Sequence, residues 1–121
     1  MAVCIVEDDP LVREVFATAL DTAGYDVVPY ASAEAAFAAA EVSGAPPEAW
    51  VVDIELGDRR LDGLALGNMV RLRWPSAGVV YVTAFPHLLN DRRLRLRERA
   101  CAKPCDITRL TALVGELIET T

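Results

Sequence analysis

The stretch VCIVEDDP, residues 3–10, decides the fold of this chain. A short apolar run ends at three acidic residues and a proline, and a segment with helical spacing of its apolar residues, Leu11–Ala23, follows directly. The run does not alternate apolar with polar residues, so we expect both faces of this strand to be buried. A strand of that kind is typical of a parallel sheet that is covered by helices on both sides.

The same succession of apolar run, breaker and helical segment returns along the chain. Further strands are predicted at Tyr25–Val28, Trp50–Asp53, Val79–Val82 and Ala100–Ala102, and further helices at 33–42, 64–74 and 107–119, with Ser32 and Asp106 as N-caps. This alternation predicts an α/β fold with a doubly wound five-stranded parallel sheet, (βα)5. Where the fourth helix belongs, the segment Arg92–Arg99 has arginines alternating with leucines, so a short or irregular helix is expected there.

Composition restricts the class of protein. The 121 residues are 53% hydrophobic and 25% charged, which is typical of one globular domain, predicted to span residues 1–121. No apolar run reaches the ~20 residues of a membrane span, and the start has no signal-peptide pattern, so a cytoplasmic location and no membrane partner are expected. The net charge of −6, with −10 in residues 1–62 and +4 in residues 63–121, argues against direct nucleic-acid binding.

Polar side chains follow four of the predicted strands at their carboxyl ends, which meet at one edge of a doubly wound sheet. They are Glu7, Asp8 and Asp9 after the first strand, Asp53 at the third, Thr83 after the fourth and Lys103 after the fifth. Carboxylates packed together repel one another unless a cation joins them, and an oxygen-only set favours Mg²⁺. Lys103, the only lysine beside eleven arginines, and Thr83 suit phosphoryl oxygens. Together these groups predict phosphoryl transfer to the Asp53 carboxylate.

Each of these features taken alone also has a plainer explanation. Acidic residues before a helix are often caps, and an aspartate after a strand is a common turn residue, so only their joint placement indicates chemistry. The three cysteines, Cys4, Cys101 and Cys105, are an odd number without metal-ligand spacing, so ordinary thiols are favoured over a redox role. For the arginine-rich segment 92–99, a solvated charged face and a partner-docking surface both stay open.

Four motifs of the chain resemble those of the response-regulator receiver family of two-component signalling. They are VEDDPLVR at 6–13, VDIEL at 52–56 with Asp62-Gly63, VTA at 82–84, and Lys103-Pro104, and the resemblance covers the whole chain. It implies a flavodoxin-like fold, with Asp53 as the phosphoacceptor, Thr83 as the switch hydroxyl and Lys103 as the family's conserved amine. It also implies Mg²⁺ as cofactor, held by Glu7, Asp8, Asp53 and the backbone carbonyl of Glu55, with Asp9 as an extra neighbour.

The resemblance also implies the partners. A stand-alone receiver is a signalling domain and not an enzyme, although it catalyses phosphoryl transfer to its own aspartate and the later loss of that group. A histidine kinase or a histidine phosphotransfer protein would supply the phosphoryl group. A downstream protein target would contact the face formed by the fourth helix and the fifth strand.

The chain departs from the family pattern in the residues that report phosphorylation. Ala100 stands three residues before the lysine, where the family has an aromatic switch residue, and Cys105 stands where Phe is usual. Phe85, two residues after Thr83, is a substitute aromatic, as in some stand-alone receivers of alphaproteobacteria. A receiver-like interaction module that acts independently of phosphorylation is therefore an open alternative. Flavin-binding proteins and Asp-nucleophile phosphatases are disfavoured, because the first strand leads into Glu-Asp-Asp-Pro and not into a phosphate loop or an Asp-x-Asp motif.

Overall fold

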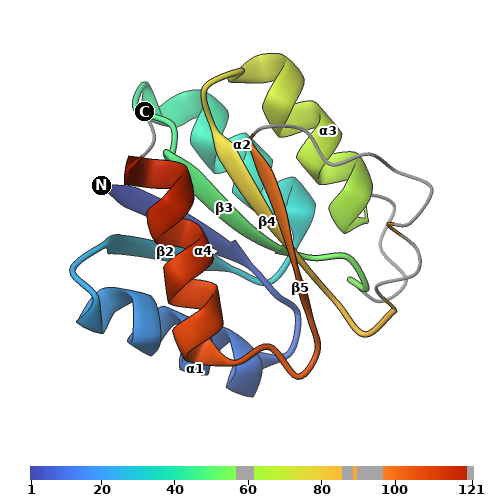
Figure 1. Ribbon diagram of the computed structural model, residues 1–121. Helices are drawn as coiled ribbons and strands as arrows, with labels where there is room; N and C mark the ends of the chain where they lie inside the picture. Colours follow the sequence, from blue (N-terminus) through green and yellow to red (C-terminus); the bar gives the residue numbers. More distant parts are fainter. Residues whose placement is uncertain (57–61, 86–88, 90–96, 120–121) are drawn as a thin grey trace.

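A computed structural model describes residues 1–56, 62–85, 89 and 97–119 (Figure 1). Five strands form one parallel sheet in the order β2-β1-β3-β4-β5, which confirms the predicted doubly wound α/β fold. The elements in chain order are β1 (Ala2–Val6), α1 (Pro10–Thr22), β2 (Asp26–Tyr30), α2 (Ala33–Ser43), β3 (Ala49–Asp53), α3 (Gly63–Arg73), β4 (Gly78–Thr83), β5 (Glu98–Ala102) and α4 (Ile107–Glu119). The strand order changes direction between β1 and β3, which places a topological switch point at the carboxyl ends of these two strands.

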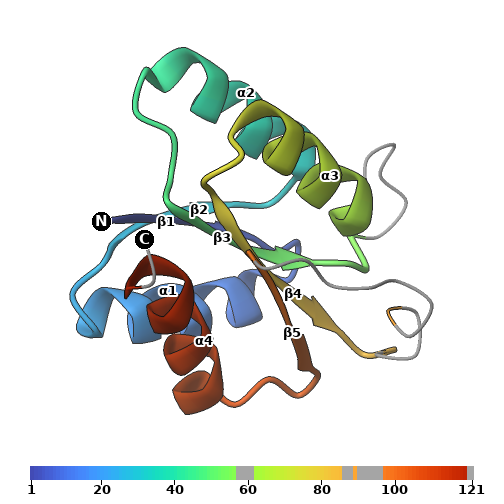
Figure 2. The same ribbon diagram turned by 45° about the horizontal axis from the view of Figure 1, so that its top comes forward.

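Two pairs of helices cover the two faces of the sheet, as Figure 2 shows. α1 and α4 lie on one face, and α2 and α3 lie on the other. Because β1 is apolar, and β3 and β4 are apolar up to the polar residue that ends each of them, their side chains fill both interfaces. Large buried residues on the side of α1 and α4 are Phe16, Leu20, Leu110 and Leu117. Those on the side of α2 and α3 are Trp50, Leu66, Val70 and Tyr81.

The helices begin where short polar side chains accept backbone amides. Asp9 accepts hydrogen bonds from the N–H groups of Leu11 and Val12 at the start of α1, and Asp62 caps α3. The caps predicted from the sequence are confirmed, since Ser32 accepts the N–H of Ala35 at 3.2 Å and Asp106 accepts that of Thr108 at 2.7 Å. No helix among the described residues is both long enough and apolar enough to cross a membrane.

Three details of the predicted elements differ from the structure. β2 begins one residue later and continues through Pro29, which an edge strand tolerates because its outer side needs no amide donor. β5 begins at Glu98, so the last two residues of the arginine-rich segment 92–99 pair with β4 instead of continuing a helix, whereas residues 92–96 of the predicted helix lie outside the described residues. Ile107 follows the helical apolar spacing of 107–119 and is therefore expected on its inner face, yet it is 45% exposed because it lies in the first turn beside a groove between α1 and α4.

Gly67 of α3 packs against the ring of Tyr81 in β4, and this contact leaves no room for a side chain. A Cβ atom at position 67 would overlap the hydroxyl of Tyr81, which is fully buried and donates a hydrogen bond of 2.8 Å to Glu98. We expect Gly67→Ala to lower the free energy of unfolding by about 1–3 kcal/mol, the usual cost of overpacking a core. Urea titration followed by circular dichroism measures the change. Leu72→Ala, at an 85% exposed position of the same helix, is the control, and an equally small effect of both would show that Tyr81 gives way.

Candidate functional site

The carboxyl ends of four strands bring the predicted polar residues to one edge of the sheet. Asp53 and Thr83 are the last residues of β3 and β4, while Glu7 and Lys103 directly follow β1 and β5. These four strands are neighbours in the order β1-β3-β4-β5, so the four side chains converge. Glu7, Asp53 and Thr83 are buried, and Lys103 is partly exposed.

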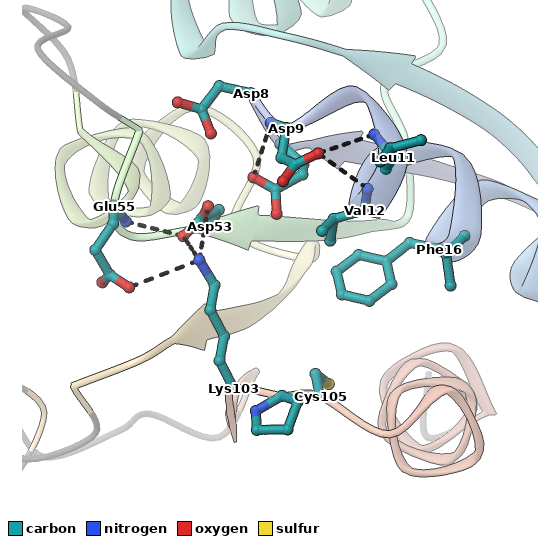
Figure 3. A pocket seen from close by; sticks show the side chains of 12 residues that line it. Asp8, Asp9, Leu11, Val12, Phe16, Asp53, Glu55, Lys103 and Cys105 are labelled. Carbon is teal, nitrogen blue, oxygen red and sulfur yellow. Dashed lines mark hydrogen bonds and ion pairs between the residues drawn. The ribbon is translucent and has the colours of Figure 1, made fainter.

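Lys103 and Asp53 form an ion pair at the centre of the site (Figure 3). The Lys103 Nζ lies 3.0 Å from each of the two carboxylate oxygens of Asp53. The backbone holds the lysine in place, since its N–H donates to the Thr83 carbonyl at 2.8 Å. Burial alone would lower the pKa of Lys103, but the hydrogen bond to Asp53 and the nearby carboxylate charges together raise its pKa above the ordinary value. The amine is therefore a permanent positive charge beside Asp53.

Three carboxylates form the acidic part of the site. Glu7, Asp8 and Asp53 each offer an oxygen, and these oxygens all lie within 4.8 Å of one another. Burial raises the pKa of Glu7 to about 8, and the hydrogen bond and charge of Asp53 act in the same direction. An oxygen-only donor set of this charge fits a hard divalent cation such as Mg²⁺. Asp9 lies outside this group, because its side chain accepts the amides at the start of α1.

Both the backbone and the side chain of Glu55 form hydrogen bonds within the site. Its N–H donates to Asp53 Oδ1 at 2.9 Å. Its carboxylate accepts the Thr83 hydroxyl at 2.6 Å and the Ala84 N–H at 2.8 Å, and lies 3.8 Å from the Lys103 Nζ. The family resemblance implies only a backbone carbonyl ligand at this position, and residue spacing does not encode the direction of a side chain in a turn.

The turn that carries Glu55 is fixed by one carbonyl group. The Ile54 carbonyl accepts the N–H of Leu56 at 3.2 Å and the N–H of Gly63 at 3.3 Å. Gly63 is the first residue of α3, and a Cβ atom there would overlap the backbone of Asp53 and Ile54. The first residue of α3 therefore packs directly against the backbone of Asp53 and Ile54.

Ala100, which stands where the family has an aromatic residue, lies beside a tyrosine of the neighbouring strand. In the sheet register Ala100 is paired with Tyr81 of β4, and both pack into the core on the side of α2 and α3. The Tyr81 hydroxyl donates to Glu98, so this ring is fixed. Phe85, the substitute named from the sequence, is 51% exposed, and its N–H donates to Thr83 Oγ1 at 2.9 Å.

The expectation of ordinary thiols holds for only one of the cysteines. Cys4 is a buried free thiol, and burial raises its pKa to about 12. Cys101 and Cys105 form a disulfide that spans Lys103 and Pro104, which corrects the expectation for these two residues. The sequence did not indicate it, because a pair of cysteines four residues apart is brought together only by the turn after β5, which leaves their Cα atoms 5.9 Å apart.

An open pocket lies beside the acidic group and gives access to Asp53. Its volume is about 720 Å³. The polar end is formed by the charged residues described above, and the apolar side is formed by α1 and the turn after β5, with Val12, Phe16, Pro104 and Cys105 (Figure 3). The site thus combines a buried carboxylate, a fixed ammonium, a group of acids and an opening to solvent.

Comparison with known proteins gives a consistent result. The family model for the response regulator receiver domain matches residues 3–114. The transcriptional regulatory protein AruR of Pseudomonas aeruginosa is 38% identical over 84 residues, which cover 67% of this chain and 33% of that protein. The chain therefore spans about a third of the length of this relative.

Solved structures of similar fold are receiver domains. The receiver domain of NtrX from Brucella abortus is 25% identical, with a TM-score of 0.84 over 98% of this chain and 99% of that one. A response regulator receiver protein from Sinorhizobium medicae has a TM-score of 0.85 at 21% identity, over 98% of this chain and 94% of its own. The second likeness concerns the fold alone.

Proposed function

The chain belongs to the response regulator receiver family, and on that basis we propose that Asp53 accepts a phosphoryl group in a Mg²⁺-dependent reaction. Receiver domains are signalling domains of two-component response regulators. The observation that carries the proposal is the Asp53 carboxylate, which pairs through both oxygens with Lys103 at 3.0 Å and lies beside Glu7 and Asp8 at an open pocket. Intact-mass measurement after incubation with acetyl phosphate and Mg²⁺ tests it, and the mass should increase by that of a phosphoryl group.

In the proposed reaction Asp53 is the nucleophile. One of its carboxylate oxygens forms a bond to phosphorus, while the bond from phosphorus to the histidine nitrogen of the donor breaks and its electron pair stays on that nitrogen. Lys103 compensates negative charge on the carboxylate before the transfer and on the phosphoryl oxygens after it. Thr83 would donate its hydroxyl to the same oxygens. The protein would also catalyse the later hydrolysis of its aspartyl phosphate.

The acidic group is the proposed Mg²⁺ site. Glu7, Asp8 and Asp53 would hold the ion, together with the backbone carbonyl of Glu55. When bound, Mg²⁺ neutralises charge on the transferring phosphoryl group. Glu7 and Asp8 would supply charge that retains the ion, while Asp53 would both help to hold it and be the nucleophile.

The proposed donor is a histidine kinase or a histidine phosphotransfer protein, and the proposed read-out is contact with a downstream protein in the cytoplasm. The target would contact the face formed by β5 and the helix expected over residues 92–99. Of that face, the structure describes β5 and its pairing with β4.

A receiver-like module that works without phosphorylation is the second candidate. One observation favours it, namely that Ala100 replaces the family's aromatic while the neighbouring Tyr81 is fully buried and hydrogen-bonded to Glu98. Among the described residues, the aromatic ring between β4 and β5 is therefore one that a hydrogen bond holds in place. This candidate predicts no change in mass with acetyl phosphate.

Mg²⁺ binding is expected to be coupled to loss of a proton from Glu7. The pKa of Glu7, raised by burial to about 8, leaves this carboxyl neutral at pH 7. A carboxyl must ionise to hold a metal, so the apparent affinity for Mg²⁺ should increase as the pH rises toward about 8 and then level off. Calorimetric titration with MgCl2 in two buffers of different ionisation enthalpy measures the released proton.

Three variants distinguish proton release from Glu7 on Mg²⁺ binding from a general effect of negative charge. Glu7→Gln should remove the proton release and weaken binding, and Asp8→Ala should abolish the binding signal. Glu14→Gln, at an exposed position of α1, should change neither. Mg²⁺ binding by the unmodified protein without proton release would contradict the raised pKa of Glu7.

A further inference from the structure

The carboxylate of Glu55 takes up the hydrogen-bond donors that lie beside Asp53. It accepts the Thr83 hydroxyl with one oxygen at 2.6 Å and the Ala84 N–H with the other at 2.8 Å. Thr83 is fully buried, so its hydroxyl has no alternative partner in solvent. The same Glu55 carboxylate lies 3.8 Å from Nζ of Lys103.

These three donors are of the kind that a phosphoryl group needs. An aspartyl phosphate carries its charge on oxygens that accept hydrogen bonds from hydroxyl, amide and ammonium groups. In the resting protein one hydroxyl and one amide already donate to Glu55, and the ammonium is shared between Glu55 and Asp53. A carboxylate and a phosphoryl group are both anions, so they compete for these donors and repel each other.

We propose that the side chain of Glu55 is an internal competitor of the phosphoryl group, which holds Thr83 and Ala84 in the resting state and leaves them when Asp53 is phosphorylated. The inference rests on the proposed function of Asp53. It assigns to the Glu55 side chain a role separate from that of its backbone carbonyl. Glu55 is half-buried at the rim of the pocket, so its carboxylate can turn into solvent when displaced.

The displacement of the Glu55 carboxylate would also affect Phe85. The Phe85 N–H donates to Oγ1 of Thr83, the same atom that donates its proton to Glu55. When the Thr83 hydroxyl turns from Glu55 to a phosphoryl oxygen, the geometry of the Phe85 amide changes with it. The displaced carboxylate and the Thr83–Phe85 turn are therefore parts of one rearrangement.

The test compares binding of beryllofluoride, a phosphoryl mimic, to the unmodified protein and to Glu55→Gln at saturating Mg²⁺. Glu55→Gln keeps the length of the side chain and removes its charge, so the mimic should bind about tenfold more tightly, a typical effect of removing one charged competitor. Glu41→Gln removes the same charge from an exposed position of α2 and should bind like the unmodified protein.

The chemical shift of the Ala84 amide is a second measurement. A merely structural role of Glu55 would not produce the pattern that we expect for it. It should differ between the unmodified protein and Glu55→Gln without the mimic, and coincide in the two complexes, because Glu55 no longer contacts the amide there. Glu55→Ala should behave in the same way if Glu55→Gln folds poorly. Equal affinities, or a difference at Ala84 that persists in the complexes, would overturn the inference alone. If beryllofluoride binds to none of the proteins, the proposed function of Asp53 falls and the inference falls with it.

Discussion

Asp53→Asn is expected to abolish phosphorylation of the protein. The amide has nearly the same shape as the carboxylate, but its oxygen carries no charge and is a poor nucleophile, so no aspartyl phosphate can form. The variant should show no increase in mass with acetyl phosphate and Mg²⁺ under conditions in which the unmodified protein is labelled. Asp53 is buried beside Lys103, so the circular dichroism of the variant should be recorded to confirm that it folds.

Asp21→Asn is the matched control for this experiment. It makes the same chemical change at an exposed position near the end of α1, far from the strand ends that carry the site, and should be labelled like the unmodified protein. Stoichiometric labelling of Asp53→Asn would assign the phosphoryl group to another residue. Absence of labelling in all three proteins would favour the module that acts without phosphorylation.

Substitution of Lys103 is expected to have the second largest effect. Lys103→Met removes the ammonium that lies 3.0 Å from both oxygens of Asp53 and keeps the apolar stem. The rate of labelling by acetyl phosphate should fall by roughly one to two orders of magnitude, the loss expected when one charge-assisted hydrogen bond is removed from a reacting group. Time courses of intact mass measure this rate.

Lys103→Arg asks whether positive charge alone is sufficient. A guanidinium is larger and binds a carboxylate through two parallel hydrogen bonds, so it would hold both oxygens of Asp53 in one plane and hinder attack on phosphorus. We expect this variant to remain close to Lys103→Met. Arg109→Lys, an exposed exchange on α4, is the control and should leave the rate unchanged. Full activity of Lys103→Arg would show that the single lysine of this chain needs only its charge.

The sequence predicts the site well where residues follow strands. Asp53, Thr83 and Lys103 meet because β3, β4 and β5 are adjacent and parallel, and apolar runs reveal such strands without any knowledge of side-chain direction. The acidic pair Glu7 and Asp8 was found by the same reasoning, since it follows β1.

The sequence is less informative where the result depends on how a turn directs a side chain. Asp9 adjoins the acidic pair in sequence, yet its side chain turns to the amides of α1. Glu55 reaches across to β4, and Cys101 meets Cys105 only because of the turn between them. Ala100 is paired with Tyr81 of the neighbouring strand and packs into the same core, which is a matter of packing between residues distant in sequence. Such contacts depend on three-dimensional packing and have no periodic signature.

The double use of the Ile54 carbonyl has a consequence for how this chain can vary in length. Leu56 and Gly63 both donate to that one oxygen, so the chain leaves the turn after Asp53 and returns to it at a single point. Lengthening a loop whose two ends are already held together costs little, about 0.6 kcal/mol for each doubling of its length. Insertions between positions 57 and 61 can therefore accumulate in evolution without moving Asp53. For the same reason this is the position at which an engineer would graft a fluorescent reporter into the protein.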